Sequence, residues 1–199
     1  MNQPPKSRLD EAVQAACALF AKLLRGRVII AAIDGGGGAG KSTLAAGIRA
    51  ALGGVSIVRT DDFYRPLDGD DRAARDPEYA YRNYLEVERL RAEALAPLRA
   101  GTAARYQPRE WTSAELRGWT EIPPNPIIIV EGVYSTRPEL RDLIELAIFV
   151  DTPRDIRLAR MKARAQIDTV WINRWMAAED RYFEDLRPLD SADLAVAGF

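Results

Sequence analysis

The sequence predicts an α/β fold with a mostly parallel sheet and helices on both faces. Short apolar runs rich in β-branched residues recur along the chain, as in Val28–Ile33 and Ile127–Val130. Continuous runs of this length are typical of strands buried on both faces. Amphipathic segments alternate with them, as expected when helices connect parallel strands. The whole chain, 1–199, is expected to form one domain of three layers.

Each element follows from the spacing of its apolar residues. The first helix, for example, carries Leu9, Val13, Ala16 and Phe20 on one side, with Cys17 as a small core residue. In chain order we expect a helix at 7–24, strands at 27–33 and 55–59 around a helix at 41–52, a helix at 83–99, a hairpin insert at about 101–126, strands at 127–130 and 147–150, helices at 154–165 and 170–183, and a strand at 192–196.

Composition excludes several classes of protein. The chain has 28 Lys and Arg against 29 Asp and Glu, with no basic run, so neither nucleic acid nor a membrane is an expected partner. The absence of histidine excludes a Ser-His-Asp triad, a Cys-His pair and a His-ligated zinc site. A single cysteine, Cys17, excludes an internal disulfide and is typical of a reducing compartment. We therefore expect a soluble cytoplasmic protein, and the sequence leaves a homo-oligomer open.

A glycine-rich segment between the first strand and the second helix matches the pattern G-x-x-x-x-G-K-[ST]. Glycines let backbone N–H groups turn inward around an anion, and the helix that follows adds its positive end. Lys41 can reach the outer phosphates and Ser42 can hold Mg²⁺. A flexible linker is the alternative, but linkers do not lie between such elements. The predicted nucleotide-binding residues are Gly35, Gly36, Gly37, Gly38, Ala39, Gly40, Lys41, Ser42 and Thr43.

Carboxylates follow two of the predicted strands. Asp61 and Asp62 come directly after the strand at 55–59, and Glu131 follows the strand at 127–130. Ligands of open parallel sheets lie beyond the carboxyl ends of the strands, so these acids should face the phosphates. There a carboxylate could accept a proton from a hydroxyl or help hold Mg²⁺. The alternatives are a turn or helix cap for the aspartates and a solvated loop for Glu131.

In motif order the chain resembles the uridine kinase/phosphoribulokinase group of P-loop kinases. The motifs that carry this resemblance are Ile33-Asp34-Gly35 leading into Gly40-Lys41-Ser42-Thr43, then Asp61-Asp62-Phe63-Tyr64, Val130-Glu131-Gly132, and Val150-Asp151 before Arg157-Leu158-Ala159-Arg160. The resemblance implies a P-loop NTPase fold, ATP with Mg²⁺ as cofactors, Asp61 as catalytic base, and Ser42, Asp61 and Glu131 as the metal site.

The resemblance further implies a lid, here the helices at about 154–183, whose arginines close over the phosphates. Arg157, Arg160 and Arg164 stand at i, i+3 and i+7 and share one helix face, with Arg160 and Arg164 the stronger catalytic candidates beside Lys41. The alternative is a solvated basic face paired with Asp155 and Asp168.

The acceptor should bind beside the insert. Asp61, Tyr64, Tyr106, Arg109 and Glu131 are the predicted acceptor-site residues. The aromatic residues of this region either stack on a base or form a small core. These residues are Tyr64, Tyr81, Tyr84, Tyr106, Trp111 and Trp119.

The predicted function is transfer of the γ-phosphate of ATP to a hydroxyl of a small molecule. A nucleoside is the first candidate, although Gln107 stands where nucleoside-phosphorylating relatives typically have Asp. The alternatives are a kinase of a sugar or vitamin alcohol, or a P-loop protein that binds or hydrolyses ATP to regulate a partner. A GTPase is disfavoured because the chain has no Asn-Lys-x-Asp motif.

Overall fold

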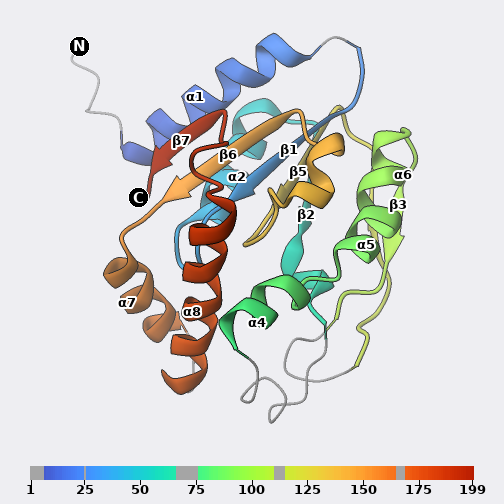
Figure 1. Ribbon diagram of the computed structural model, residues 1–199. Coiled ribbons are helices and arrows are strands. Elements are labelled where there is room, and N and C mark those ends of the chain that lie inside the picture. The colour runs from blue at the N-terminus through green and yellow to red at the C-terminus, as the bar shows by residue number, and fades with distance from the viewer. Residues whose placement is uncertain (1–6, 25, 66–75, 110–114, 165–168) are drawn as a thin grey trace, which may run out of the picture.

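A parallel sheet of five strands forms the centre of the molecule (Figure 1), with the strand order β2-β5-β1-β6-β7. The computed structural model describes residues 7–24, 26–65, 76–109, 115–164 and 169–199, without the side chain of Arg164. All four pairings within this sheet are parallel. Its strands are β1 (Ile29–Asp34), β2 (Val55–Arg59), β5 (Ile127–Glu131), β6 (Leu146–Asp151) and β7 (Leu194–Ala197).

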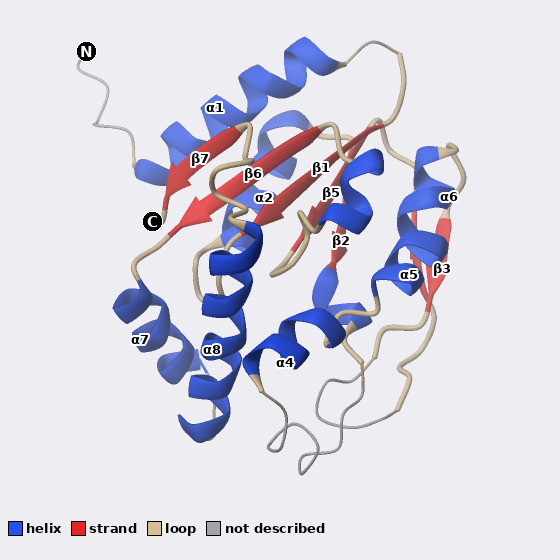
Figure 2. Ribbon diagram, viewed as in Figure 1, coloured by secondary structure: helices blue, strands red, loops and turns tan. Residues whose placement is uncertain are grey.

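Helices cover both faces of the sheet (Figure 2). One face packs against α1 (Arg8–Leu23) and α2 (Lys41–Leu52). The other packs against α4 (Pro77–Asn83), the helical stretch formed by α5 (Val87–Leu90), η2 (Arg91–Leu95) and α6 (Ala96–Arg99), and α8 (Thr169–Leu186). Two short helices, η1 (Thr60–Phe63) and η3 (Pro138–Leu143), follow β2 and β5, and α7 (Arg154–Arg164) follows β6.

The central strand β1 shows why a continuous apolar run was needed. Ile30 and Ala32 point into the core beneath α8, whereas Ile29, Ala31 and Ile33 point into the core beneath α1 and α2. A strand covered on both faces has no solvent side, and every position from Ile29 to Ile33 is apolar. The predicted three-layer α/β fold is confirmed.

The region after β2 differs in part from the prediction. The expected helix at 83–99 begins only at Val87, and a separate helix, α4, precedes it. Asp76 caps α4 by accepting the N–H of Tyr79, with Pro77 in the first turn, a start signal that the periodicity did not reveal. The predicted hairpin insert is present as β3 (Ala104–Tyr106) and β4 (Thr120–Ile122), an antiparallel pair.

Two predictions for the first helix need correction. Cys17 is only partly buried, because Ala16 and Phe20 take the innermost positions of α1. Leu24 ends the helix and is 40% exposed. Among the described residues, no helix combines the length and apolar character needed to cross a membrane.

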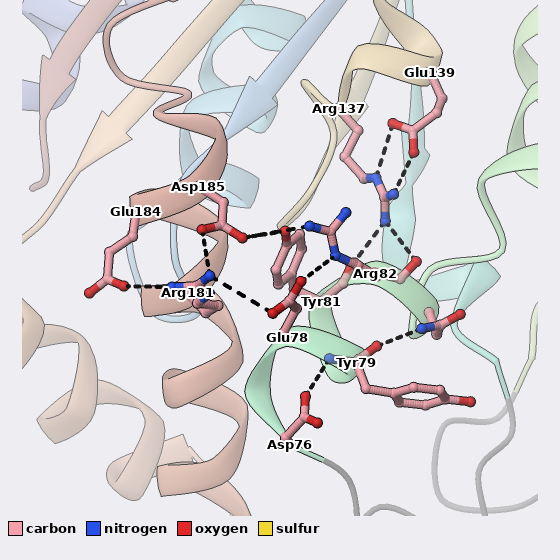
Figure 3. A network of polar contacts seen from close by, with 11 residues as sticks. Asp76, Glu78, Tyr79, Tyr81, Arg82, Arg137, Glu139, Arg181, Glu184 and Asp185 are labelled. Carbon is pink, nitrogen blue, oxygen red and sulfur yellow. Dashed lines mark hydrogen bonds and ion pairs between the residues drawn. The ribbon is translucent and has the colours of Figure 1, made fainter.

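A network of polar contacts joins α4 to α8 (Figure 3). The hydroxyl of Tyr81 donates to Asp185 at 2.6 Å, and Arg181 pairs with Asp185 at 3.1 Å. Arg181 also reaches Glu78 on α4 at 3.8 Å. From the loop after β5, Arg137 donates to the carbonyl of Tyr81 at 3.0 Å. The contacts of Tyr81 with Asp185 and of Glu78 with Arg181 hold α8 against α4.

Candidate active site

The glycine-rich loop lies between β1 and α2, as the sequence predicted. Its glycine and alanine residues, 35–40, are buried or half-buried, and α2 begins at Lys41. The Lys41 ammonium is buried and donates to the carbonyl oxygen of Gly36 at 2.8 Å. The side chain therefore bends back over the loop, close to where the loop amides would meet phosphate oxygens. Ser42 and Thr43 are exposed in the first turn of α2.

Ser42 contacts the acid that ends β5. Its hydroxyl donates to Oε1 of Glu131 at 2.9 Å. Glu131 is 5% exposed, so the alternative of a solvated loop residue is wrong. Burial raises the pKa of the Glu131 carboxyl, while the nearby Lys41 charge opposes that rise. The carboxylate is therefore part of a buried cluster of charges beside the glycine-rich loop.

The ends of β5 and β2 touch. Gly132 has a φ of 144°, and a Cβ on it would lie 1.8 Å from Oγ1 of Thr60. Only glycine permits both this backbone conformation and this approach. The contact brings the position of Glu131, at the end of β5, next to the turn that carries Asp61.

Asp61 and Asp62 lie in η1, a tight helical turn that directly follows β2. The two carboxyl groups have different surroundings. Asp62 accepts a hydrogen bond from the Tyr106 hydroxyl at 3.0 Å. Asp61 is exposed, yet the protein around its carboxyl group raises its pKa by desolvation, which Lys41 opposes and Asp62 reinforces. The charge of Lys41 in the phosphate loop thus acts on the Asp61 carboxyl, whereas the Asp62 carboxyl is hydrogen-bonded to the insert.

The other predicted acceptor-site residues make contacts within the protein. Tyr64 is buried and meets the Trp175 ring edge-on, with 5.1 Å between centroids. Tyr106 is buried, and burial raises the pKa of its phenol above the usual range. Arg109 forms a forked pair with Glu86 at 2.8 and 3.3 Å. Their roles toward an acceptor stay predictions.

The aromatic residues of this region mainly form a core. Tyr64, Tyr81, Tyr84 and Tyr106 all belong to the buried cluster between the sheet, α4 and α8. Trp119 differs, because it is 59% exposed and lies under the guanidinium of Arg105 at 4.1 Å. Trp111 lies outside the described residues.

The arginines of α7 reach the glycine-rich loop. Arg157 is 5% exposed and donates to Glu179 of α8 at 2.6 Å, so it is neither solvated nor paired with Asp155. Arg160 donates to the carbonyl of Gly38 at 3.1 Å and to that of Phe199 at 2.7 Å. The Arg164 side chain and Asp168 lie outside the described residues. Two of the three predicted arginines thus contact the loop or the residue that holds it.

Several residues of the site were missed by sequence reasoning. Asp34, fully buried at the end of β1, accepts the Gly35 N–H at 2.7 Å and the Tyr182 hydroxyl at 2.7 Å. Glu179, also fully buried, accepts the Gly37 N–H at 2.7 Å. One signal was available: Glu179 continues the buried stripe of α8 after Ile172 and Met176, where an acid is unexpected.

The donors at this edge of the sheet fit a magnesium ion that also binds phosphate. The described residues hold no cluster of three acidic, His or Cys side chains that could bind a metal alone. Ser42 and Glu131 supply hard oxygen atoms 2.9 Å apart, and the charge of Asp61 acts on Glu131. Mg²⁺ prefers such oxygens and usually takes its other ligands from water and substrate phosphates.

Comparisons with known proteins identify the family of this chain. Residues 29–168 match the model of the Phosphoribulokinase / Uridine kinase family. The chain is 31% identical over 170 residues to a uridine kinase of Staphylococcus aureus (strain JH9), covering 80% of this chain and 78% of that protein. It is 30% identical over 147 residues to a uridine kinase of Clostridium perfringens, covering 69% and 68%.

Solved structures share the fold. A possible uridine kinase from Bacillus stearothermophilus aligns with a TM-score of 0.76 at 20% identity, over 96% of this chain and 100% of that one. A phosphoribulokinase from Rhodobacter spheroides aligns with a TM-score of 0.56 at 16% identity, over 86% and 70%. With the family model covering most of the chain, the resemblance found in the motifs is confirmed: this chain belongs to the phosphoribulokinase/uridine kinase family of small-molecule kinases.

Proposed function

We propose that this small-molecule kinase transfers the γ-phosphate of Mg²⁺-ATP to a hydroxyl of a nucleoside, with Asp61 as the catalytic base. One observation carries the proposal. Lys41 and Ser42 begin α2, Glu131 ends β5 and Asp61 lies in η1, yet their charges and hydrogen bonds meet at a single edge of the sheet. A cation, two carboxylates and a hydroxyl are the groups that phosphoryl transfer requires there.

The loop and Lys41 bind the triphosphate. Amides of the loop and the N-terminal end of α2 favour negative charge, and Lys41 lies over them. When phosphates arrive, the Lys41 ammonium exchanges the Gly36 carbonyl for phosphate oxygens, which bind a cation more strongly. In the transition state the same ammonium stabilises charge on the transferred group.

Ser42 and Glu131 would hold Mg²⁺, which neutralises the charge of the outer phosphates when it is bound. The nearby charge of Lys41 favours the ionised form of Glu131, which is the form that binds a cation, and a bound Mg²⁺ would favour it further. The close contact of Gly132 with Thr60 keeps the Glu131 carboxylate near the turn that carries Asp61.

Asp61 would accept the proton of the acceptor hydroxyl as its oxygen attacks phosphorus. Desolvation raises the pKa of Asp61 and makes it a stronger base than an ordinary aspartate. Asp62 is less suited to this role because its Oδ2 already accepts the Tyr106 hydroxyl, and it would instead align the insert. The arginines of α7 would screen the phosphates from water, with Arg160 already at the loop.

A nucleoside is the proposed acceptor because the curated relatives named above are called uridine kinases. Sugars and vitamin alcohols are the second candidates, because Gln107 of the insert stands where nucleoside-phosphorylating relatives typically have Asp. The side-chain amide of Gln107 donates to the carbonyl of Arg117 at 3.1 Å, so it braces the hairpin from within.

An acceptor screen tests the proposal. Purified protein with Mg²⁺-ATP is supplied with nucleosides, sugars and vitamin alcohols, while ADP release and the phosphorylated product are both measured. We expect acceptor-dependent ADP release with a nucleoside, and release about 10²–10⁴-fold slower in the Asp61→Asn variant. Equal ADP release with and without every acceptor would contradict transfer and favour ATP hydrolysis.

A further inference from the structure

The carboxylate of Glu179, on α8, is buried and contacts the glycine-rich loop, which lies far away in the sequence. Its Oε1 accepts the N–H of Gly37 at 2.7 Å, across 142 residues of sequence. Its Oε2 accepts Nη1 of Arg157 at 2.6 Å. Trp175, one turn earlier on α8, also hydrogen-bonds to it. Each oxygen is therefore engaged by a donor from a different element.

A buried carboxylate is costly unless donors compensate for the water that it loses. Glu179 is 0% exposed and continues a stripe that otherwise carries Ile172 and Met176. An apolar residue would fill that stripe without the desolvation cost. The donors around Glu179 are the loop amide and the guanidinium of α7, so the acid joins elements that packing alone would not hold.

Arg157, which donates to Glu179, also packs closely against the glycine-rich loop. A Cβ on Gly36 would lie 2.0 Å from Nη1 of Arg157, so the guanidinium lies directly against the loop backbone. One turn along α8 from Glu179, Tyr182 donates to Asp34, which in turn accepts the N–H of Gly35. Helix α8 thus holds two amides of the loop, one directly and one through Asp34.

We propose that Glu179 is a positioning residue that holds the Gly37 amide and Arg157, so that the glycine-rich loop keeps the shape that binds nucleotide phosphates. This inference rests on the proposed function only in that the loop binds ATP. The helix has other contacts that hold it in place, because Tyr81 with Asp185 and Glu78 with Arg181 already join α4 to α8 (Figure 3).

The variants Glu179→Gln and Glu179→Asp test the proposal, with Glu184→Gln as the matched control. Glu184 is on the same helix, but its side chain is 70% exposed and pairs only at the surface with Arg181. Gln keeps the shape and an oxygen for Gly37, and loses the charge that faces Arg157. Asp keeps the charge on a shorter side chain.

The readouts are the melting temperature, the Kd of Mg²⁺-ATP by calorimetry without acceptor, and the KM of each substrate. We expect Glu179→Gln to raise the Kd and the KM of ATP about tenfold, the scale of a lost charged hydrogen bond, with the KM of the acceptor unchanged. Glu179→Asp should recover part of the loss. Glu184→Gln should match the wild type. A merely structural role would lower the melting temperature and the active fraction without separating the two KM values.

A tighter Kd in Glu179→Gln would overturn the proposal, since it would mean that the carboxylate occupies the phosphate position and competes with ATP. An unchanged Kd would overturn it as well. If Glu179→Gln does not fold, the ¹⁵N-glycine spectrum of the wild type decides: the Gly37 amide should keep its hydrogen-bonded shift when Mg²⁺-ADP binds, and loss of that shift contradicts the proposal. Because binding is measured without acceptor, failure of transfer to every acceptor would count against the proposed function alone.

Discussion

The Ser42 hydroxyl lies 2.9 Å from a carboxylate oxygen of Glu131, although 89 residues separate the two in sequence. The contact joins the first turn of α2 to the end of β5. It places two oxygen donors where Mg²⁺ would bridge the protein and the phosphates.

Replacing Glu131 by Gln tests this relationship. The amide oxygen can still accept the Ser42 hydrogen bond, so we expect a folded protein that has lost only the charge. The kcat should fall by about 10²–10³-fold, and the Mg²⁺ concentration for half-maximal activity should rise. A Mg²⁺ titration of activity measures both. Glu11→Gln, on the exposed surface of α1, is the control, and an unchanged Mg²⁺ dependence would contradict the assignment.

Lys41→Ala should nearly abolish transfer. The ammonium is buried over the loop, so its loss removes a phosphate-bridging charge from a site poor in water. We expect kcat/KM for ATP to fall at least about 10³-fold, measured by ADP release at saturating acceptor. Lys22→Ala, on the exposed last turn of α1, should behave as the wild type. Substantial turnover by Lys41→Ala would remove the loop from the mechanism.

The two neighbouring aspartates should respond differently to substitution. Asp61→Asn should lower kcat by about 10²–10⁴-fold, the usual scale for loss of a general base, while Mg²⁺-ATP still binds. Asp62→Asn should cost much less, because its carboxylate is engaged with Tyr106. Steady-state kinetics and a separate ATP titration compare the pair. If Asp62→Asn is the inactive variant, the roles are reversed.

Stability should depend on pH in a way that reveals Asp61. Because its pKa is raised in the folded state, the native protein binds more protons than the unfolded chain, and this group destabilises increasingly as pH rises through the raised value. Asp61→Asn should therefore melt at a higher temperature than the wild type at pH 8, and the gap should close toward pH 4.

Asp142→Asn serves as the control of opposite sign. Arg91 lowers the pKa of Asp142 by a direct hydrogen bond, so this variant should be the less stable one at pH 8 and should approach the wild type in acid. Melting curves from pH 4 to 8 decide both cases. If the advantage of Asp61→Asn in melting temperature over the wild type instead grew in acid, the folded protein would stabilise the ionised Asp61 carboxyl and not desolvate it.

Gly132→Ala should damage both the fold and the activity. The new methyl group would lie 1.8 Å from Oγ1 of Thr60, and residue 132 has a φ of 144°, so the turn that carries Thr60 and Asp61 must move. We expect a loss of about 2–3 kcal/mol in the free energy of unfolding and a lower kcat. Gly118→Ala is the matched control, because its Cβ would meet nothing within 4 Å. Urea denaturation compares the two variants.

The sequence predicted most of the sheet and the phosphate loop because their signals are local. A strand buried on both faces must be apolar at every position, and a loop around an anion needs glycine followed by Lys and Ser. Glu131 was found for the same reason, since the end of a buried strand can be located from the run before it. The positions of these residues are therefore encoded within a few neighbours.

The missed features depend on contacts between distant parts of the chain. Thr60, at the start of the turn that carries Asp61 and Asp62, packs against Gly132, a contact that neither segment reveals alone. Glu179 meets Gly37 only after α8 has folded across the sheet. The acid within an apolar stripe was a visible anomaly, but periodicity does not say which donor would satisfy it.

The hairpin of β3 and β4 forms a sheet of its own and shares no strand with the central one. The Tyr106 hydroxyl donates to the Asp62 carboxylate, and the N–H of Arg109 donates to the Asp62 carbonyl, so both hydrogen bonds join the insert to the turn that carries Asp61. If the acceptor binds beside this insert, as the sequence predicts, an enzyme of this kind can acquire a different acceptor through changes in one appended ribbon. The chemistry of phosphate transfer and the choice of what receives it can then evolve at separate rates.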